Sequence, residues 1–93
     1  MITEIIPGVW GIDGASHHNE WIRETGKLAH DDNALPRILP HIPEGGVVVD
    51  AGAYIGTMAS AFLEKGGPMG RVLAFEPNKE SFECLRRNCP NAE

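Results

Sequence analysis

The chain has 93 residues, of which 42% are hydrophobic, a length and composition that fit one small globular domain. Its 8 Lys and Arg against 13 Asp and Glu give a net charge of −5, which argues against a nucleic-acid partner because such proteins carry a clustered basic face. No apolar run reaches the roughly 18 residues of a membrane span, and the N-terminus lacks the basic flank and apolar core of a secretory signal. We therefore expect a cytoplasmic protein with neither a membrane nor a nucleic acid as partner.

The N-terminal part of the chain, residues 1–29, is weakly patterned, and we treat it as a segment distinct from residues 30–93. Glycine, histidine and polar residues interrupt its apolar positions. A short helix is expected over residues 19–25, with Asn19 as its N-cap and Gly26 as its stop. The segment is therefore predicted to be partly helical.

Two kinds of side chain in this region bear on function. Trp10 and Trp21 are interpreted as packing anchors of the N-terminal segment, with a place in the lining of a ligand site as the alternative. His17-His18 and the run at residues 30–32, His-Asp-Asp, suggest metal ligands, but their spacing is irregular and no third cluster accompanies them. We expect these residues to be solvated and predict no metal site.

The next expected helix covers residues 32–42, because apolar residues recur at the spacing of one helical face. That stripe consists of Leu35, Ile38, Leu39 and Ile42. Asp32 or Asn33 can cap its start, and Pro40 is expected to end or kink it. Residues 43–46, Pro-Glu-Gly-Gly, then form a turn.

Two strands and two helices are predicted in the remaining residues. The run of three valines at 47–49 is apolar on both faces and fits a buried parallel strand. A helical stripe follows, formed by Ile55, Met58, Ala59, Phe62 and Leu63, and glycines 66 and 67 end it. The second strand covers residues 71–75. Asn78 then caps a helix over residues 79–88, whose inner face is expected to carry Phe82, Leu85 and Cys89.

The two cysteines, Cys84 and Cys89, lie five positions apart at the end of this last helix. Helical spacing does not bring them together for a disulfide, and their spacing alone is no metal motif. We expect both to be reduced, partly buried thiols.

The alternation of strands and helices defines the fold class. Two strands separated by a helix specify a right-handed crossover and a parallel sheet covered by helices. We therefore predict an α/β fold, a partial Rossmann-like, doubly wound parallel sheet made of its first two βα units, preceded by an N-terminal helical segment.

The turn after the first strand has the features of a ligand-binding turn. In open α/β sheets ligands bind at the carboxyl ends of the strands. Gly52 allows a tight turn and the close approach of a ligand, and Gly56 allows the next helix to pack on the strand. Asp50 ends the first strand and Glu76 the second, which places both carboxylates at one edge of the sheet. Glu76 is suited to accept hydrogen bonds from the two hydroxyls of a ribose.

The glycine spacing indicates which nucleoside ligand fits. A dinucleotide fingerprint needs glycines at relative positions 0, 2 and 5, whereas Gly52 and Gly56 are four positions apart and Tyr54 stands between them. The chain has no phosphate-binding P-loop motif. An acid at position 50 complements a cationic ligand better than a pyrophosphate. S-adenosylmethionine, with a sulfonium, an ammonium and a ribose, meets these requirements.

The stretches VVVDAGAYIGTMAS and VLAFEPNKESFECLRRN resemble the first two motifs of S-adenosylmethionine-dependent methyltransferases, most closely those of the FkbM type. The likeness covers residues 28–92. It implies that Asp50 and the turn face the methionyl part of the cofactor and that Glu76 holds the ribose. The cofactor-binding residues that it implies are Asp50, Gly52, Ala53, Tyr54, Ile55, Gly56, Glu76 and Pro77.

The resemblance has two departures. Tyr54 replaces the Asn that is usual in the family, so either the turn avoids positive φ at this position or the aromatic ring covers part of the pocket. The family's domain also continues through further strands that carry the acceptor site. We thus expect the cofactor-binding half of a methyltransferase that carries out O-methyl transfer to a small-molecule or glycan acceptor. The chain is expected to be inactive by itself, or to be a protomer that completes its sheet as a homo-oligomer.

Two alternatives remain open. One is a non-catalytic remnant or assembly domain with the same fold, and the other is half of an NAD(P)-binding dehydrogenase. The glycine spacing disfavours the dehydrogenase. Neither the methyl acceptor nor a catalytic base can be assigned from the sequence.

Overall fold

The computed structural model describes residues 1–29 and 33–93. The chain begins with an antiparallel hairpin of β1 (Ile2–Ile6) and β2 (Val9–Ile12), followed by helix α1 (Ser16–Thr25). A two-residue Pro7-Gly8 connection joins the strands, with Gly8 at a φ of 81°. The sequence did not lead us to expect this hairpin, although proline and glycine between two β-branched runs are a turn signal.

Helix α1 begins earlier than predicted, and Asn19 is not its cap. Asn19 lies buried inside the helix, and its side-chain amide donates to the carbonyl of Ile12 at 3.0 Å. The predicted stop is confirmed, because Gly26 caps the helix in the left-handed conformation at a φ of 72°. The side chain of Asn19 therefore ties α1 to the hairpin instead of capping the start of the helix.

The predicted helix at 32–42 is shorter in the structure. It consists of α2 (Leu35–Ile38) followed by a 3₁₀ turn over Leu39–His41, and the change falls where Pro40 interrupts α-helical hydrogen bonding. Asp32, one of the two suggested caps, lies outside the described residues. The expected turn at 43–46 is confirmed by a hydrogen bond from the N–H of Gly46 to the carbonyl of Pro43.

The second half follows the predicted order closely. Strand β3 (Val47–Ala51), helix α3 (Thr57–Gly66), strand β4 (Arg71–Phe75) and helix α4 (Lys79–Asn88) succeed one another. The two strands pair in parallel, with Val48 opposite Val72 and Asp50 opposite Ala74. The chain is thus a mixed α/β protein with a parallel two-stranded sheet.

One face of this sheet departs from the prediction of a strand buried on both sides. Val47, Val49 and Phe75 are exposed over 60%, 62% and 58% of their surface. The opposite face carries Val48 and Val72 and packs against the core. In the described structure the sheet is therefore covered on one face only.

The edge of β4 that faces away from β3 forms backbone hydrogen bonds with Glu93. The N–H of Glu93 donates to the carbonyl of Val72 at 2.8 Å, and the N–H of Ala74 donates to the carbonyl of Glu93 at 2.8 Å. This pair of bonds has the pattern of a parallel bridge between Glu93 and Leu73. The Arg71 guanidinium also pairs with the Glu93 carboxylate at 2.8 Å.

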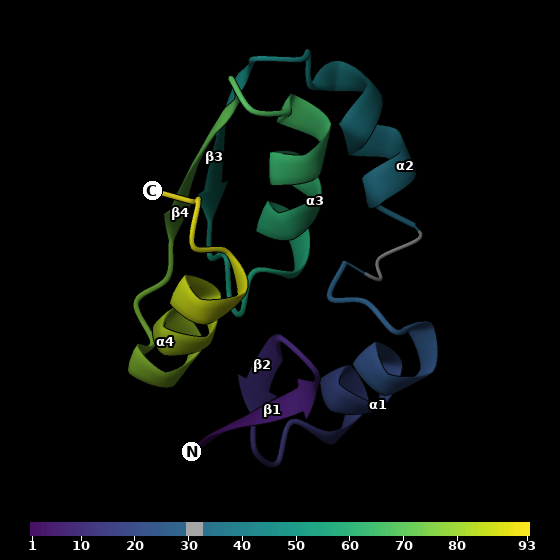
Figure 1. The fold of residues 1–93 in the computed structure, drawn as a ribbon, viewed down its shortest axis with the longest axis vertical. Coiled ribbons are helices and arrows are strands. Elements are labelled where there is room, and N and C mark those ends of the chain that lie inside the picture. Colours follow the sequence, from purple (N-terminus) through teal and green to yellow (C-terminus); the bar gives the residue numbers. More distant parts are fainter. Residues whose placement is uncertain (30–32) are drawn as a thin grey trace.

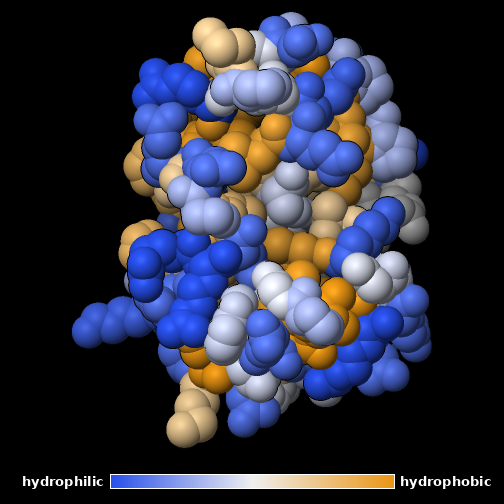
Figure 2. All heavy atoms as spheres, in the orientation of Figure 1, coloured by the Kyte–Doolittle hydropathy of each residue, from blue (hydrophilic) through white to orange (hydrophobic). Residues whose placement is uncertain are grey.

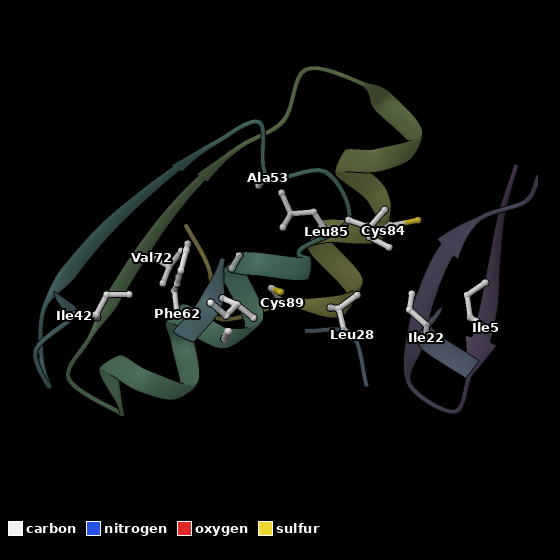
Figure 3. Close-up of a cluster of buried hydrophobic side chains, with 14 residues drawn as sticks. Ile5, Ile22, Leu28, Ile42, Ala53, Phe62, Val72, Cys84, Leu85 and Cys89 are labelled. Carbon is white, nitrogen blue, oxygen red and sulfur yellow. The ribbon is translucent and has the colours of Figure 1, made fainter. Parts of the chain in front are cut away.

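The hydrophobic core joins both parts of the chain. Figure 3 shows Cys84, Leu85, Cys89 and Leu28 between the hairpin side, where Ile5 and Ile22 lie, and the sheet side. Phe82, which the sequence placed on the inner face of α4, is 47% exposed, whereas Cys84 is fully buried in its place. Leu85 and Cys89 are buried as predicted, and Cys84 replaces Phe82 because α4 packs against the hairpin.

The N-terminal unit, which we define as residues 1–28, lies at the carboxyl ends of β3 and β4 (Figure 1).

In the same view Figure 2 shows a mainly hydrophilic surface with apolar residues visible between the polar ones. Among the described residues, no helix has the length and apolar character needed to cross a membrane.

Candidate functional site

The turn after β3 is fixed by backbone hydrogen bonds to the end of β4. The N–H groups of Gly52 and Ala53 both donate to the carbonyl of Phe75, at 2.8 and 2.9 Å. The N–H of Gly56 donates to the carbonyl of Ala53 at 2.9 Å, which closes the turn before α3 begins. The sheet edge and the turn therefore form one rigid unit.

The carboxylate of Glu76 is held by two backbone donors. The N–H of Tyr54 donates to Oε1 at 2.8 Å, and the N–H of Asn78 donates to Oε2 at 3.0 Å. Asn78 also caps α4, as predicted, by accepting from the N–H of Ser81 at 3.0 Å. Each carboxylate oxygen has a further lone pair, so Glu76 can accept two more hydrogen bonds from a ligand.

Asp50 is a half-buried carboxyl near the same turn. Its Oδ2 atom is buried and has no hydrogen-bond partner among the described residues. Burial raises the pKa of the Asp50 carboxyl above its ordinary value. An acceptor atom in this position is incomplete until a donor or a cation reaches it.

The two glycines of the turn differ in their surroundings. Gly52 has a φ of 75°, and a Cβ added to it would meet no atom within 4 Å, so space is open above it. Gly56 has a φ of 99°, and a Cβ there would lie 2.7 Å from Cys89 Sγ and 3.2 Å from Leu85 Cδ1. Gly52 thus leaves room for a ligand, and Gly56 allows α4 to pack against the turn.

The other predicted site residues divide into core and surface. Ala53 and Ile55 are 3% and 0% exposed, so their side chains pack in the core and only their backbone is available to the site. Pro77, which follows Glu76, is exposed. The structure therefore brings Asp50, Gly52 and Glu76 to one edge of the sheet.

Tyr54 adopts a left-handed conformation with a φ of 55°. The suggestion that the turn avoids positive φ at this residue is therefore wrong. Its ring lies 5.1 Å from the ring of His18, with a tilt of 52° between the two planes. Burial, the Cys84 thiol and the Glu76 carboxylate raise the pKa of the Tyr54 phenol. The ring is thus fixed against the N-terminal unit.

Sequence reasoning missed two residues that touch the turn. His18 contacts Tyr54 from α1, and Asn88 of α4 donates to the carbonyl of Ile55 at 2.8 Å. Both come from elements whose relation to the turn depends on tertiary packing. No signal in the sequence pairs residue 18 with residue 54.

The remaining polar and thiol groups form no separate site in the described structure. Among its residues, no group of three His, Cys, Asp or Glu side chains is placed to hold a metal ion. The run at 30–32 that suggested metal ligands lies outside the described residues. Cys84 and Cys89 are both free and fully buried. Trp10 packs against the core as predicted, and the Arg87 guanidinium lies 4.4 Å from the centroid of its ring. Trp21 is 50% exposed and contacts the His18 ring edge-on at 6.0 Å, so it does not anchor the core as predicted.

No protein-family model, curated protein or solved structure matches the chain with significance. The functional interpretation therefore rests on the turn, its two carboxylates and their surroundings.

Proposed function

We propose that the chain is the cofactor-binding part of an S-adenosylmethionine-dependent methyltransferase. The observation that carries this proposal is the Glu76 carboxylate, held by the N–H groups of Tyr54 and Asn78 beside an open glycine turn. With its orientation fixed and two lone pairs available, Glu76 can accept hydrogen bonds from both hydroxyls of a ribose.

Asp50 supports a cationic ligand. Its Oδ2 atom is buried and without a partner among the described residues, and its charge is partly removed from water. A ligand ammonium or sulfonium would satisfy this oxygen and offset the cost of its burial, whereas a pyrophosphate would repel it. The fit favours S-adenosylmethionine over a phosphate-bearing nucleotide.

The role proposed for each residue follows from its position. Glu76 binds the ribose, Gly52 admits the ligand against the backbone, and Asp50 attracts its positive end. When bound, S-adenosylmethionine would supply an electrophilic methyl group to an acceptor oxygen or nitrogen, with its sulfur released as a neutral thioether and the acceptor's proton released to solvent. This kind of reaction depends chiefly on the alignment of donor and acceptor. We propose O-methyl transfer to a small-molecule or glycan acceptor in the cytoplasm.

A second candidate function is an assembly domain, and the exposed sheet face favours it. Val47, Val49 and Phe75 present an apolar surface on the uncovered side of the sheet, and a second copy of the chain that covers it would form a homo-oligomer. An NAD(P)-binding dehydrogenase half is the least favoured candidate, because Tyr54 stands where a middle glycine would admit a pyrophosphate.

Calorimetric titration distinguishes these functions. We expect the chain to bind S-adenosylhomocysteine and not NADH. Binding of NADH alone would support the dehydrogenase half, and binding of neither would support the assembly domain. Sedimentation of the same sample would then show whether the chain forms a homo-oligomer.

A further inference from the structure

The amide side chain of Asn88 connects three parts of the chain. Its Oδ1 atom accepts from the backbone N–H of Trp10 at 2.7 Å, and its Nδ2 atom donates to the carbonyl of Trp10 at 2.7 Å. The same Nδ2 atom donates to the carbonyl of Ile55 at 2.8 Å. Asn88 is the last residue of α4, so one side chain bonds the hairpin and the glycine turn to this helix.

Only a side chain with both a donor and an acceptor can make this set of bonds. An amide pairs with the N–H and the carbonyl of one residue at once, and its second hydrogen remains for a further acceptor. An aspartate at this position would keep the bond from the Trp10 N–H and lose both donated bonds. The Arg87 guanidinium over the Trp10 ring adds a second contact between α4 and β2.

The carbonyl that Asn88 holds belongs to the turn itself. Ile55 follows Tyr54, whose N–H is bonded to Glu76, and precedes Gly56, whose N–H closes the turn. His18 of α1 lies against the Tyr54 ring. The N-terminal unit is therefore linked to two consecutive residues of the turn, to Ile55 indirectly through the side chain of Asn88 and to Tyr54 directly through His18.

We propose that Asn88 is a positioning residue that couples the N-terminal unit to the nucleoside-binding turn. The identity of the ligand in this inference rests on the proposed function, whereas the coupling itself does not depend on it. Loss of the Asn88 bonds frees the Ile55 carbonyl and loosens the Tyr54 N–H that orients Glu76. Because coupling between two equilibria is reciprocal, ligand binding at the turn also stabilises the docked hairpin.

The test compares Asn88→Asp with Ile42→Val, a core substitution at the opposite end of the sheet from the turn (Figure 3). Ile42→Val destabilises the fold without touching the turn. Hydrogen exchange of the Tyr54 amide, measured without ligand, should be faster by roughly tenfold or more in Asn88→Asp alone, since one lost hydrogen bond is worth about that factor. Equal exchange in the two variants overturns the coupling.

The second readout is the affinity for S-adenosylhomocysteine, at a temperature where circular dichroism shows both variants folded. We expect roughly tenfold weaker binding to Asn88→Asp and unchanged binding to Ile42→Val. In the unaltered chain the ligand should also slow exchange of the Trp10 amide. Equal affinities of the two variants overturn the positioning role.

The two proposals fail in different ways. If the unaltered chain does not bind S-adenosylhomocysteine, the proposed function is contradicted, while the Tyr54 exchange rate still decides whether Asn88 holds the turn. Asn91→Ala, at an exposed asparagine three residues further along the chain, is the control for loss of an amide and should change neither readout.

Discussion

The backbone N–H of Tyr54 donates to Oε1 of Glu76 at 2.8 Å, across the gap between the glycine turn and the end of β4. A left-handed residue in the turn, with a φ of 55°, directs its N–H toward a carboxylate that the proposed ligand also needs. Glu76 therefore holds the turn, and in the proposed function it also binds the ribose.

Glu76→Gln should weaken binding of S-adenosylhomocysteine by roughly tenfold or more, because hydrogen bonds to a charged acceptor are about twice as strong as neutral ones. It should also lower the free energy of unfolding by about 1–3 kcal/mol, since one of two backbone donors loses a good acceptor. Calorimetry and thermal unfolding measure the two effects. Glu64→Gln, at an exposed acid on α3, should change neither, and full ligand affinity in Glu76→Gln would contradict the assignment.

Asp50→Asn should stabilise the fold at pH 7 and weaken the ligand. The folded pKa of Asp50 is raised by burial, so the folded state holds a proton that the unfolded state has lost, and stability falls as pH rises above about 4. Removal of the charge should raise Tm at pH 7 by roughly 2–4 °C, a small value because solvent screens a half-buried carboxyl. The gain should vanish below about pH 4, where the carboxyl is protonated in both states.

The effect of Asp50→Asn on ligand affinity should depend on the charge of the ligand. Binding of the sulfonium cofactor should weaken more than binding of its neutral thioether product, because only the cofactor has a second positive charge near the carboxylate. Equal losses for both ligands would show that Asp50 does not face the sulfonium. A lower Tm at pH 7 would contradict the burial argument.

The two glycines of the turn give a matched pair of substitutions. Gly56→Ala should cost about 3 kcal/mol or more, because its Cβ would lie 2.7 Å from Cys89 Sγ in a left-handed backbone. Gly52→Ala meets no atom within 4 Å and should cost only the backbone strain, about 1–2 kcal/mol. Urea unfolding compares the two.

The affinity for the ligand should also distinguish Gly52→Ala from Gly56→Ala. Gly52→Ala places a methyl group in the open space above the turn and should weaken S-adenosylhomocysteine binding even where the protein is fully folded. If Gly52→Ala binds the ligand as the unaltered chain does, the ligand does not approach the backbone at this residue.

Burial raises the pKa of the Cys89 thiol to about 11, with the Asp50 charge adding to the effect. The folded thiol stays protonated at pH values where the unfolded one ionises, so stability should fall as pH rises from about 8.5. Alkylation of the native protein at pH 8 should be slower than that of an ordinary thiol by roughly tenfold or more, because less thiolate is present and the sulfur is buried. Cys89→Ala should reduce the alkaline loss of stability, and rapid alkylation of native Cys89 would contradict its burial.

The second half of the fold was predictable because local signals there agree with tertiary packing. Strand β4 and helix α4 have the predicted bounds, and Asn78 caps α4 as expected. The N-terminal hairpin was not predicted, because its two strands have only five and four residues and are also stabilised by contact with α4. On the inner face of α4, Leu85 and Cys89 were predicted correctly and Phe82 was not, since contact with the hairpin buries Cys84 and leaves Phe82 exposed.

The candidate site was predictable in part. Asp50, Gly52 and Glu76 lie at adjacent strand ends, and strand order alone brings such residues together. The contacts of Asn88 and His18 with the turn depend on how α4 and α1 pack, which residue spacing does not encode. The left-handed backbone of Tyr54 was left open by the sequence, because tyrosine disfavours this conformation and only the surrounding bonds impose it.

The central claim is that a nucleoside carrying the S-adenosyl group binds between the glycine turn and Glu76. Amide NMR spectra recorded during titration with S-adenosylhomocysteine test it most directly. We predict that the largest shifts occur at the amides of Gly52, Tyr54 and Asn78, which line the turn or bond to Glu76. The absence of shifts at these three amides, or shifts confined to other parts of the chain, would contradict it.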